Sequence, residues 1–267
     1  MASWKKLTVS LSVFGCLLGV SGCATDRSKD EWTPNVVTPS DETDTRRRAR
    51  IKLELASGYL EAGKPEIALD EVKQVLALEP DFADAHNLRG LIFLQLNDLR
   101  TAEDSLRRSV SLNGRDPNTW HNLGWVYCQQ QKWAESNSAF QRALAQPNYA
   151  GQPRTHLLMG LCQARAGQMA DAVRSLTRSV EMDPANPLAA YNLSLLLYRS
   201  HNNQQAQFYI RRLNNSESAN SESLWLGIRI EHRLGNADAV KQLADQLKRR
   251  FPQAQELGKY ERGLFDE

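Results

Sequence analysis

The sequence predicts an all-α protein: a right-handed superhelical solenoid of six helix pairs, closed by a short C-terminal capping helix. Small residues recur at a step of about 34 residues along most of the 267-residue chain. Prolines fall near the ends of these units, where a missing N–H and a fixed φ stop a helix. No segment shows the period-two alternation of a strand. A repeat of this length indicates stacked supersecondary units with a shared core.

Two columns of small residues define the units. The first column has steps of 34, 34, 36, 34 and 33 residues, and each member of the second column lies 12 residues after its partner. A small side chain on each of two antiparallel helices lets their backbones pack closely, while bulky neighbours fill the space around the crossing. The first column is Ala56, Gly90, Gly124, Gly160, Ser194 and Gly227, and the second is Ala68, Ala102, Ser136, Ala172, Ala206 and Ala239.

One segment identifies the kind of repeat. Residues 120–127, WHNLGWVY, match the pattern W-x2-L-G-x2-Y, so the units resemble tetratricopeptide repeats. The resemblance predicts six units over residues 46–252. Residues 253–267 are expected to cover the exposed apolar side of the last unit, because Leu257, Tyr260 and Leu264 fall on one helical face.

The first 22 residues have the features of a lipoprotein signal peptide. Lys5 and Lys6 precede an apolar run over residues 7–20, which is too short to span a bilayer. The next residues, VSGC at 20–23, resemble the bacterial lipobox, which implies a lipid on Cys23. Ala24 follows and favours the outer membrane. We therefore expect a lipid-anchored protein on the periplasmic face of that membrane, with residues 23–45 as the lipidated cysteine and a flexible tether.

Composition and motifs exclude several classes of function. Without Lys5 and Lys6 the chain has 31 basic and 31 acidic side chains, so no basic face for nucleic acid is expected. HExxH, GxSxG and CxxC motifs are absent from the sequence, and the histidines are scattered. A nucleophile pair of Cys128 and His121, two helical turns apart, lacks an orienting acid. We expect that this protein is not an enzyme and that it binds no metal and no small-molecule substrate. The only group that we expect it to carry is the lipid on Cys23.

The first helix of each unit is expected to line a concave, apolar binding surface. The inward positions carry few of the Lys, Arg and Asn that grip a charged peptide end, with Arg154, Arg165 and Arg199 among them, so an extended or helical apolar segment is the expected ligand. The alternative is that some of these residues pack under a neighbouring unit or the terminal helix. The expected groove residues are Leu53, Leu60, Leu91, Leu94, Trp125, Leu157, Leu161, Tyr191, Leu195 and Tyr198, followed by Leu224 and Ile228.

Cys128 and Cys162 lie 34 residues apart, in the same position of successive units. They could be two buried thiols, members of a metal site, or a disulfide. A metal would need more ligands nearby. A disulfide is favoured because adjacent first helices touch and the periplasm oxidises thiols. It would clamp the third unit to the fourth, which the long connection over residues 147–153 otherwise leaves looser.

The stretch NLGWVYCQQQKWAESNSAFQRAL, the loop QPNYAGQP and the segment MGLCQARAG resemble the type IV pilus biogenesis and stability lipoproteins, the PilF/PilW family of secretin pilotins. The resemblance implies a scaffold that binds secretin subunits and promotes their localisation and multimerisation in the outer membrane for pilus assembly. Its partners would be a secretin subunit and, through the acyl anchor, membrane lipid. The alternative is a repeat lipoprotein that serves peptidoglycan enzymes or outer-membrane protein assembly.

Overall fold

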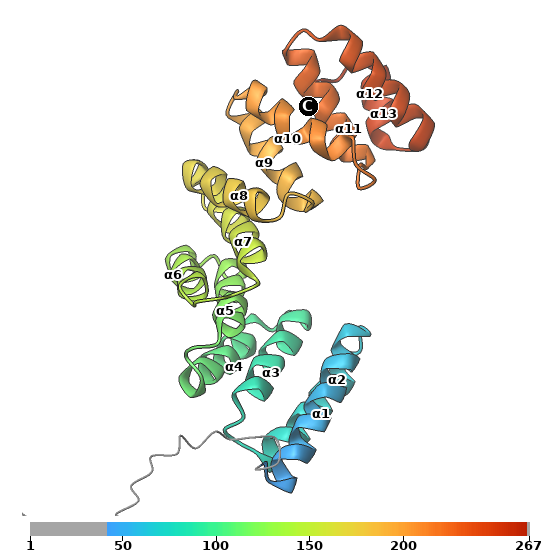
Figure 1. Cartoon of the computed structure of the whole chain (residues 1–267). Helices are drawn as coiled ribbons and strands as arrows, with labels where there is room; N and C mark the ends of the chain where they lie inside the picture. The colour runs from blue at the N-terminus through green and yellow to red at the C-terminus, as the bar shows by residue number, and fades with distance from the viewer. Residues whose placement is uncertain (1–41, 266–267) are drawn as a thin grey trace, which may run out of the picture. The chain divides into compact units, whose positions relative to one another are not determined.

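The computed structural model describes residues 42–265, which form thirteen helices and no strand. Figure 1 shows the helices following one another along the fold in chain order. They are α1 (Asp44–Glu61), α2 (Pro65–Leu78), α3 (Ala83–Gln95), α4 (Leu99–Leu112), α5 (Pro117–Gln129), α6 (Trp133–Leu144), α7 (Gln152–Arg165), α8 (Met169–Met182), α9 (Pro187–Arg199), α10 (Asn203–Asn214), α11 (Ser221–Arg233), α12 (Ala237–Arg250) and α13 (Gln255–Glu261).

Helices α1 to α12 form six antiparallel pairs, which confirms the all-α repeat fold. Each odd-numbered helix packs on the even-numbered helix that follows it, and each even-numbered helix packs on the next pair. Successive first helices also touch, as α1 and α3 or α5 and α7 do. The first helix begins at Asp44, two residues before the expected boundary, because the Thr43 hydroxyl accepts a hydrogen bond from the Arg46 amide at 3.1 Å and caps it.

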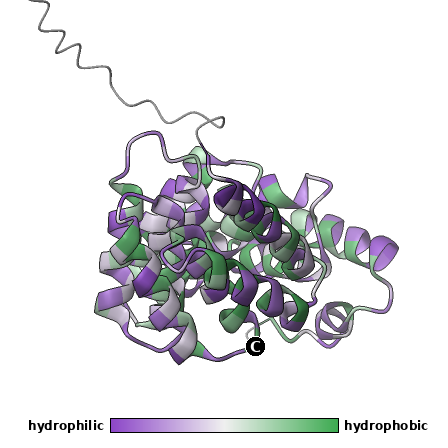
Figure 2. Ribbon diagram, turned by 90° about the horizontal axis from the view of Figure 1, so that it is seen from below, coloured by the Kyte–Doolittle hydropathy of each residue, from purple (hydrophilic) through white to green (hydrophobic). Residues whose placement is uncertain are grey.

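Small residues lie at the helix crossings within the pairs. A Cβ at Gly90 would come within 2.5 Å of the Leu106 side chain, and one at Gly124 within 2.8 Å of the Phe140 ring. Ala56 and Ala68 are fully buried where α1 crosses α2. Close backbone approach therefore explains the small residues at these crossings. Figure 2 shows hydrophobic and hydrophilic positions alternating around the same helices, as expected for elements with one side in the core.

The turn inside each pair places one residue in the left-handed region. Gly63, Gly167 and Gly235 have φ between 71° and 77° there. The equivalent turns of the second, third and fifth pairs use Asn97, Gln131 and His201, each with φ of 61°. A side chain in this conformation costs roughly 1–2 kcal/mol, so these three turns are less favourable than the glycine turns.

Helix α13 covers the last pair. Leu257 of α13 is buried against a cluster that includes Leu224 and Ile228 of α11. Phe265 stacks on the His232 ring at 4.1 Å between centroids, and its carbonyl accepts a hydrogen bond from Arg229 Nε at 2.9 Å. The C-terminal segment thus closes the apolar end of the stack. Within residues 42–265, every helix is too short or too polar to span a membrane.

Candidate functional site

Most of the expected groove residues are partly open on the first helices. Their side chains are half-buried, so each offers some apolar surface while also contacting the core. Leu53 and Leu60, for example, pack against the cluster around Val72 and Leu88. The half-buried residues are Leu53 and Leu60 of α1, Leu91 and Leu94 of α3, Trp125 of α5, Leu161 of α7, and Tyr191 and Leu195 of α9.

Two expected groove residues are buried instead, which corrects the sequence interpretation at these positions. Leu157 is 5% exposed and belongs to the core cluster around α7 to α10. Tyr198 is 3% exposed because α11 covers it, with the guanidinium carbons of Arg229 and Arg233 at 5.0 and 4.0 Å from its ring centroid. Neither side chain is open to a ligand.

Leu224 and Ile228 are also closed off. Both are fully buried, because Leu257 and Tyr260 of the C-terminal helix pack in the same cluster. At these two positions the alternative interpretation is correct, because both side chains pack under the terminal helix. The partly open apolar surface of the first helices therefore runs from α1 to α9 and ends before α11.

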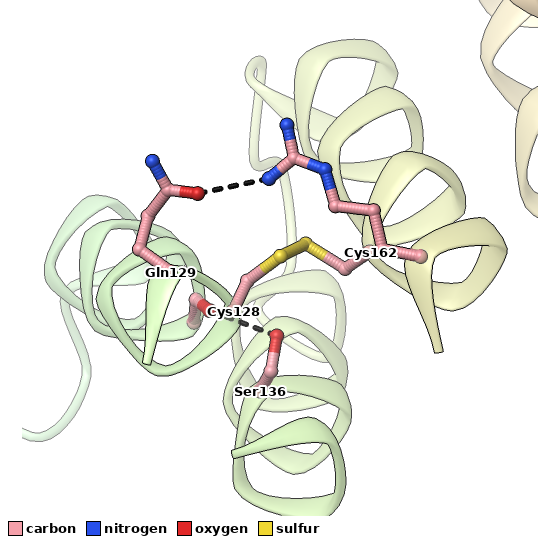
Figure 3. The surroundings of a disulfide bond; sticks show 6 residues. Cys128, Gln129, Ser136 and Cys162 are labelled. Carbon is pink, nitrogen blue, oxygen red and sulfur yellow. Dashed lines mark hydrogen bonds between the residues drawn. A yellow bond between two sulfur atoms is a disulfide. The ribbon is translucent and has the colours of Figure 1, made fainter. Parts of the chain in front are cut away.

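A disulfide joins two first helices across the third and fourth pairs. Cys128 of α5 and Cys162 of α7 are bonded, with their Cα atoms 5.8 Å apart (Figure 3). Close by, Arg165 donates a hydrogen bond to the Gln129 side chain at 2.8 Å, which links the same two helices again. With Cys128 in a disulfide, no thiol is available to pair with His121 as a nucleophile.

The connection between the third and fourth pairs is held by a buried polar cluster. His121 Nδ1 lies 2.7 Å from the Thr155 hydroxyl, which in turn lies 3.0 Å from the Tyr149 hydroxyl. Tyr149 is 9% exposed, and its ring fills the space beside Gly151, where a Cβ would come within 2.5 Å. The longer connection is therefore packed on α5 and α7, so the polar cluster holds the third and fourth pairs together in addition to the disulfide.

His121 is 3% exposed, and burial, followed by the positive charge of Arg154, lowers its pKa from 6.5 to about 4. Near neutral pH the ring is neutral, as its place inside the core requires. Among residues 42–265, no three His, Cys, Asp or Glu side chains gather as a metal site would require.

Sequence reasoning missed a groove on the side of the second helices. It lies over α5 between α4 and α6, has a volume of about 540 Å³, and contains Trp120, Leu123, Tyr127 and Arg142. From the sequence, Trp120 and Tyr127 are explained only as residues of the tetratricopeptide repeat motif, and no binding surface is assigned to them. Their spacing of seven residues, two helical turns, puts both rings on one face of α5 and was a usable signal.

The family follows from the sequence match. A tetratricopeptide repeat model matches residues 53–118, 121–187 and 157–211, which together exceed half of the chain. The chain belongs to the tetratricopeptide repeat family. The crystal structure of YrrB, described as a TPR protein with an unusual peptide-binding site, has a similar fold, with a TM-score of 0.58 at 13% identity over 72% of this chain and 97% of that one.

Two relatives of this tetratricopeptide repeat protein are similar over 80% or more of its length. The type IV pilus assembly protein PilF of Pseudomonas aeruginosa is 26% identical over 249 residues, which cover 93% of this chain and 96% of PilF. The crystal structure of PilW, described as a widely conserved type IV pilus biogenesis factor, matches with a TM-score of 0.71 and 28% identity over 80% of this chain and 98% of PilW. A PilF structure matches with a TM-score of 0.72 at 23% identity, covering 83% of this chain and all of that one. The resemblance to the PilF/PilW proteins is confirmed.

Proposed function

We propose that this protein is an outer-membrane-anchored periplasmic scaffold that binds secretin subunits and promotes their localisation and multimerisation for type IV pilus assembly. The observation that carries the proposal is the similarity to PilF over 93% of this chain and 96% of that one. The likeness to PilW, at 28% identity, supports the same process. A stack of helix pairs fits a scaffold that binds other proteins.

The proposed anchor is a lipid on Cys23, which lies outside the residues that the structure describes. Lipid chains would hold the repeats at the membrane, and the chain between Cys23 and α1 would let them reach a partner. Tethering raises the effective concentration of the scaffold near membrane-bound secretin subunits. The anchor is tested by replacing Cys23 with serine and following incorporation of radiolabelled palmitate and the membrane fraction of the protein. Equal labelling of both proteins would refute it.

The proposed secretin-binding surface is the partly open apolar side of the first helices. Leu53 and Leu60 of α1 and Leu91 and Leu94 of α3 supply it at the N-terminal end, and Trp125 of α5 continues it. These half-buried side chains suit an apolar segment of the partner, since an apolar segment gains by leaving water. The Arg165 guanidinium carbon lies 5.4 Å from the Trp125 ring centroid, so this part of the surface also carries a positive charge.

The deciding experiment is a gene deletion complemented with variants, with secretin multimers measured as heat-resistant bands in outer-membrane fractions. We expect the deletion strain to lose multimers and surface pili, and Leu91→Glu with Leu94→Glu to restore neither. The matched control is Leu188→Glu at the start of α9, because Leu188 is 52% exposed and lies outside the proposed surface.

The outcomes separate the proposal from its alternative. Normal secretin multimers in the deletion strain would refute the secretin role. Altered cell shape or a general loss of outer-membrane proteins would instead support an adaptor for peptidoglycan enzymes or for outer-membrane protein assembly. Full activity of the Leu91 and Leu94 double variant would keep the role and reject the binding surface.

A further inference from the structure

The groove over α5 is lined by residues of α4, α5 and α6. Leu123 and Ala139, each 2% exposed, are its most buried apolar lining residues, and Trp120 and Tyr127 lie along it. On an α-helix, residues seven apart are separated by about 10 Å, so the two rings mark the length of the groove. Its lining contains none of the first-helix residues assigned to secretin binding.

The residues of α6 at the open side of the groove have unusually small side chains. Ser138 lines the groove, whereas the same repeat position is Asp104 in α4, Arg174 in α8 and Phe208 in α10. Ala134 stands one turn earlier on the same side. Small side chains at both positions leave the space open that larger ones would fill, so the main chain of a ligand can approach α6.

One end of the groove carries a cation without a carboxylate partner. The guanidinium carbon of Arg142 lies 4.5 Å from the Trp120 ring centroid, and the Trp120 indole N–H donates to the Gly114 carbonyl at 2.8 Å, which fixes the ring. Among residues 42–265, Arg142 pairs with no acid. Stacking uses only the face of a guanidinium, so its in-plane N–H donors stay free for a ligand.

The repeat supplies an internal comparison for this arginine. Arg108 of α4 and Arg178 of α8 occupy the same repeat position as Arg142. Arg108 pairs with Asp81, and Arg178 pairs with Glu181 at 3.2 Å. Arg142 of α6 instead lies over an aromatic ring beside an open groove.

The opposite end of the groove is already balanced in charge. Glu103 lies 2.7 Å from Lys132 and 3.6 Å from Arg107, and Glu135 stands in the lining near Tyr127. An acidic group of a ligand therefore finds no unpaired cation at the Tyr127 end, whereas Arg142 attracts it at the Trp120 end. The charges set the direction in which a ligand lies.

We propose that this groove binds an internal segment of a partner protein in which an apolar side chain stands beside an aspartate or glutamate. The apolar side chain packs on the half-buried Trp120 and Tyr127 rings, above the buried floor of the groove, and the carboxylate pairs with Arg142. Capture of a free chain end would call for a cluster of donors, whereas a single guanidinium suits one side-chain carboxylate in a bidentate pair.

The test selects ligands without assuming their sequence. A library of 12-residue peptides, displayed within a loop so that neither end is free, is selected on the full mature chain. Enriched peptides are then made with blocked ends, and their affinities are measured by fluorescence anisotropy. We expect enriched peptides to carry an acid beside an apolar residue, and replacement of that acid by its amide to weaken binding about tenfold or more.

Variants of the chain locate the site. Arg142→Glu should weaken the selected peptides about tenfold or more, and a peptide with lysine in place of the acid should recover binding to it. The matched control is Arg178→Glu, at the equivalent exposed repeat position, which should bind like the wild type. Ser138→Trp should block the groove from an exposed position, while Ser138→Ala should leave binding unchanged.

Any of three results would overturn the proposal. The first is that no peptide is enriched on the wild-type chain. The second is that the selected peptides bind the wild type and Arg142→Glu equally. The third is that binding requires a free C-terminal carboxylate, which a parallel library with free ends would show. Secretin multimers are measured in the same variants. This measurement distinguishes a failure of the groove proposal from a failure of the proposed secretin function, because the two surfaces lie on different helix faces.

Discussion

At the residue scale, two mid-helix glycines occupy opposite environments. Gly124 of α5 lies against the fully buried Phe140 ring, where an added Cβ would come within 2.8 Å. Gly58 of α1 has nothing within 4 Å of the position of an added Cβ. The same change, glycine to alanine, therefore meets a steric limit at one site and none at the other.

We predict opposite effects of these two substitutions on the free energy of unfolding. Gly124→Ala should destabilise by about 1–3 kcal/mol, because overpacking outweighs the gain in helix propensity. Gly58→Ala should stabilise by about 0.5–1 kcal/mol, because only the propensity changes. Urea unfolding measures both variants against the wild type. A stabilised Gly124→Ala would show that the crossing of α5 and α6 can widen without cost.

His121 makes the stability of the fold depend on pH. Its pKa is lowered to about 4 by burial, and then by Arg154, while the unfolded chain titrates near 6.5. Between these values the unfolded state binds a proton that the folded state does not. The free energy of unfolding should therefore fall by roughly 2–3 kcal/mol as the pH drops from 6.5 towards 4.

The variant His121→Gln isolates this contribution, because glutamine does not titrate. Urea unfolding of both proteins between pH 4.5 and 8 should show a shallower loss of stability for the variant on the acid side. Carboxylates elsewhere contribute to both curves alike, so only the difference is informative. Parallel curves for the two proteins would contradict the role assigned to His121.

At the element scale, a disulfide bond joins two first helices, α5 and α7. The disulfide closes a loop with a sequence separation of 34 residues, and the hydrogen bond between Arg165 and Gln129 spans the same two helices. The Tyr149 ring packs the connection between them. The third and fourth pairs are therefore held together at both ends of their first helices.

Removing the disulfide should destabilise this part of the stack. For a closed loop of about 34 residues, the loss of chain entropy in the unfolded state predicts a cost of about 3–4 kcal/mol for Cys128→Ala with Cys162→Ala. Urea unfolding with and without dithiothreitol checks it. The reductant should lower the stability of the wild type and leave the double variant unchanged; a double variant as stable as the oxidised wild type would contradict the prediction.

The helix pattern was largely predictable at this scale, because each pair is built from contacts between neighbours in sequence. The residues of both small-residue columns are buried in the first five pairs, as a helix crossing requires, whereas Ala239 of the sixth pair is partly exposed. Two details were not predictable from the pattern. The start of α1 at Asp44 depends on the Thr43 cap, and the packed connection depends on where the Tyr149 ring lies relative to Thr155.

At the scale of the whole molecule, each pair contacts chiefly its neighbours in the stack. Stability in such a fold is a sum of local terms and nearest-neighbour interfaces. Disturbance at one end should therefore stay local. Helix α13 offers the test, because Leu257 is buried under the last pair while Glu261 of the same helix is exposed.

We predict that Leu257→Asp speeds amide hydrogen exchange in α11 and α12 and leaves α1 to α4 unchanged. A buried carboxylate disrupts the cap, and the distant pairs share no contact with it. Hydrogen exchange read by mass spectrometry resolves the helices separately, with Glu261→Ala as the control that should match the wild type. Faster exchange throughout the stack would show cooperativity beyond nearest neighbours.

The sequence by itself determined that this chain forms six stacked helix pairs with a terminal cover, since those features arise from short-range repetition. Only the tertiary structure decided which apolar side chains stay open. Leu91 and Leu157 both occupy first helices, yet Leu91 is half-buried and Leu157 is in the core. The groove beside Arg142 likewise needs α4, α5 and α6 in place. The physical reason is that exposure depends on what the neighbouring pairs place over each position, which the spacing within one helix does not specify.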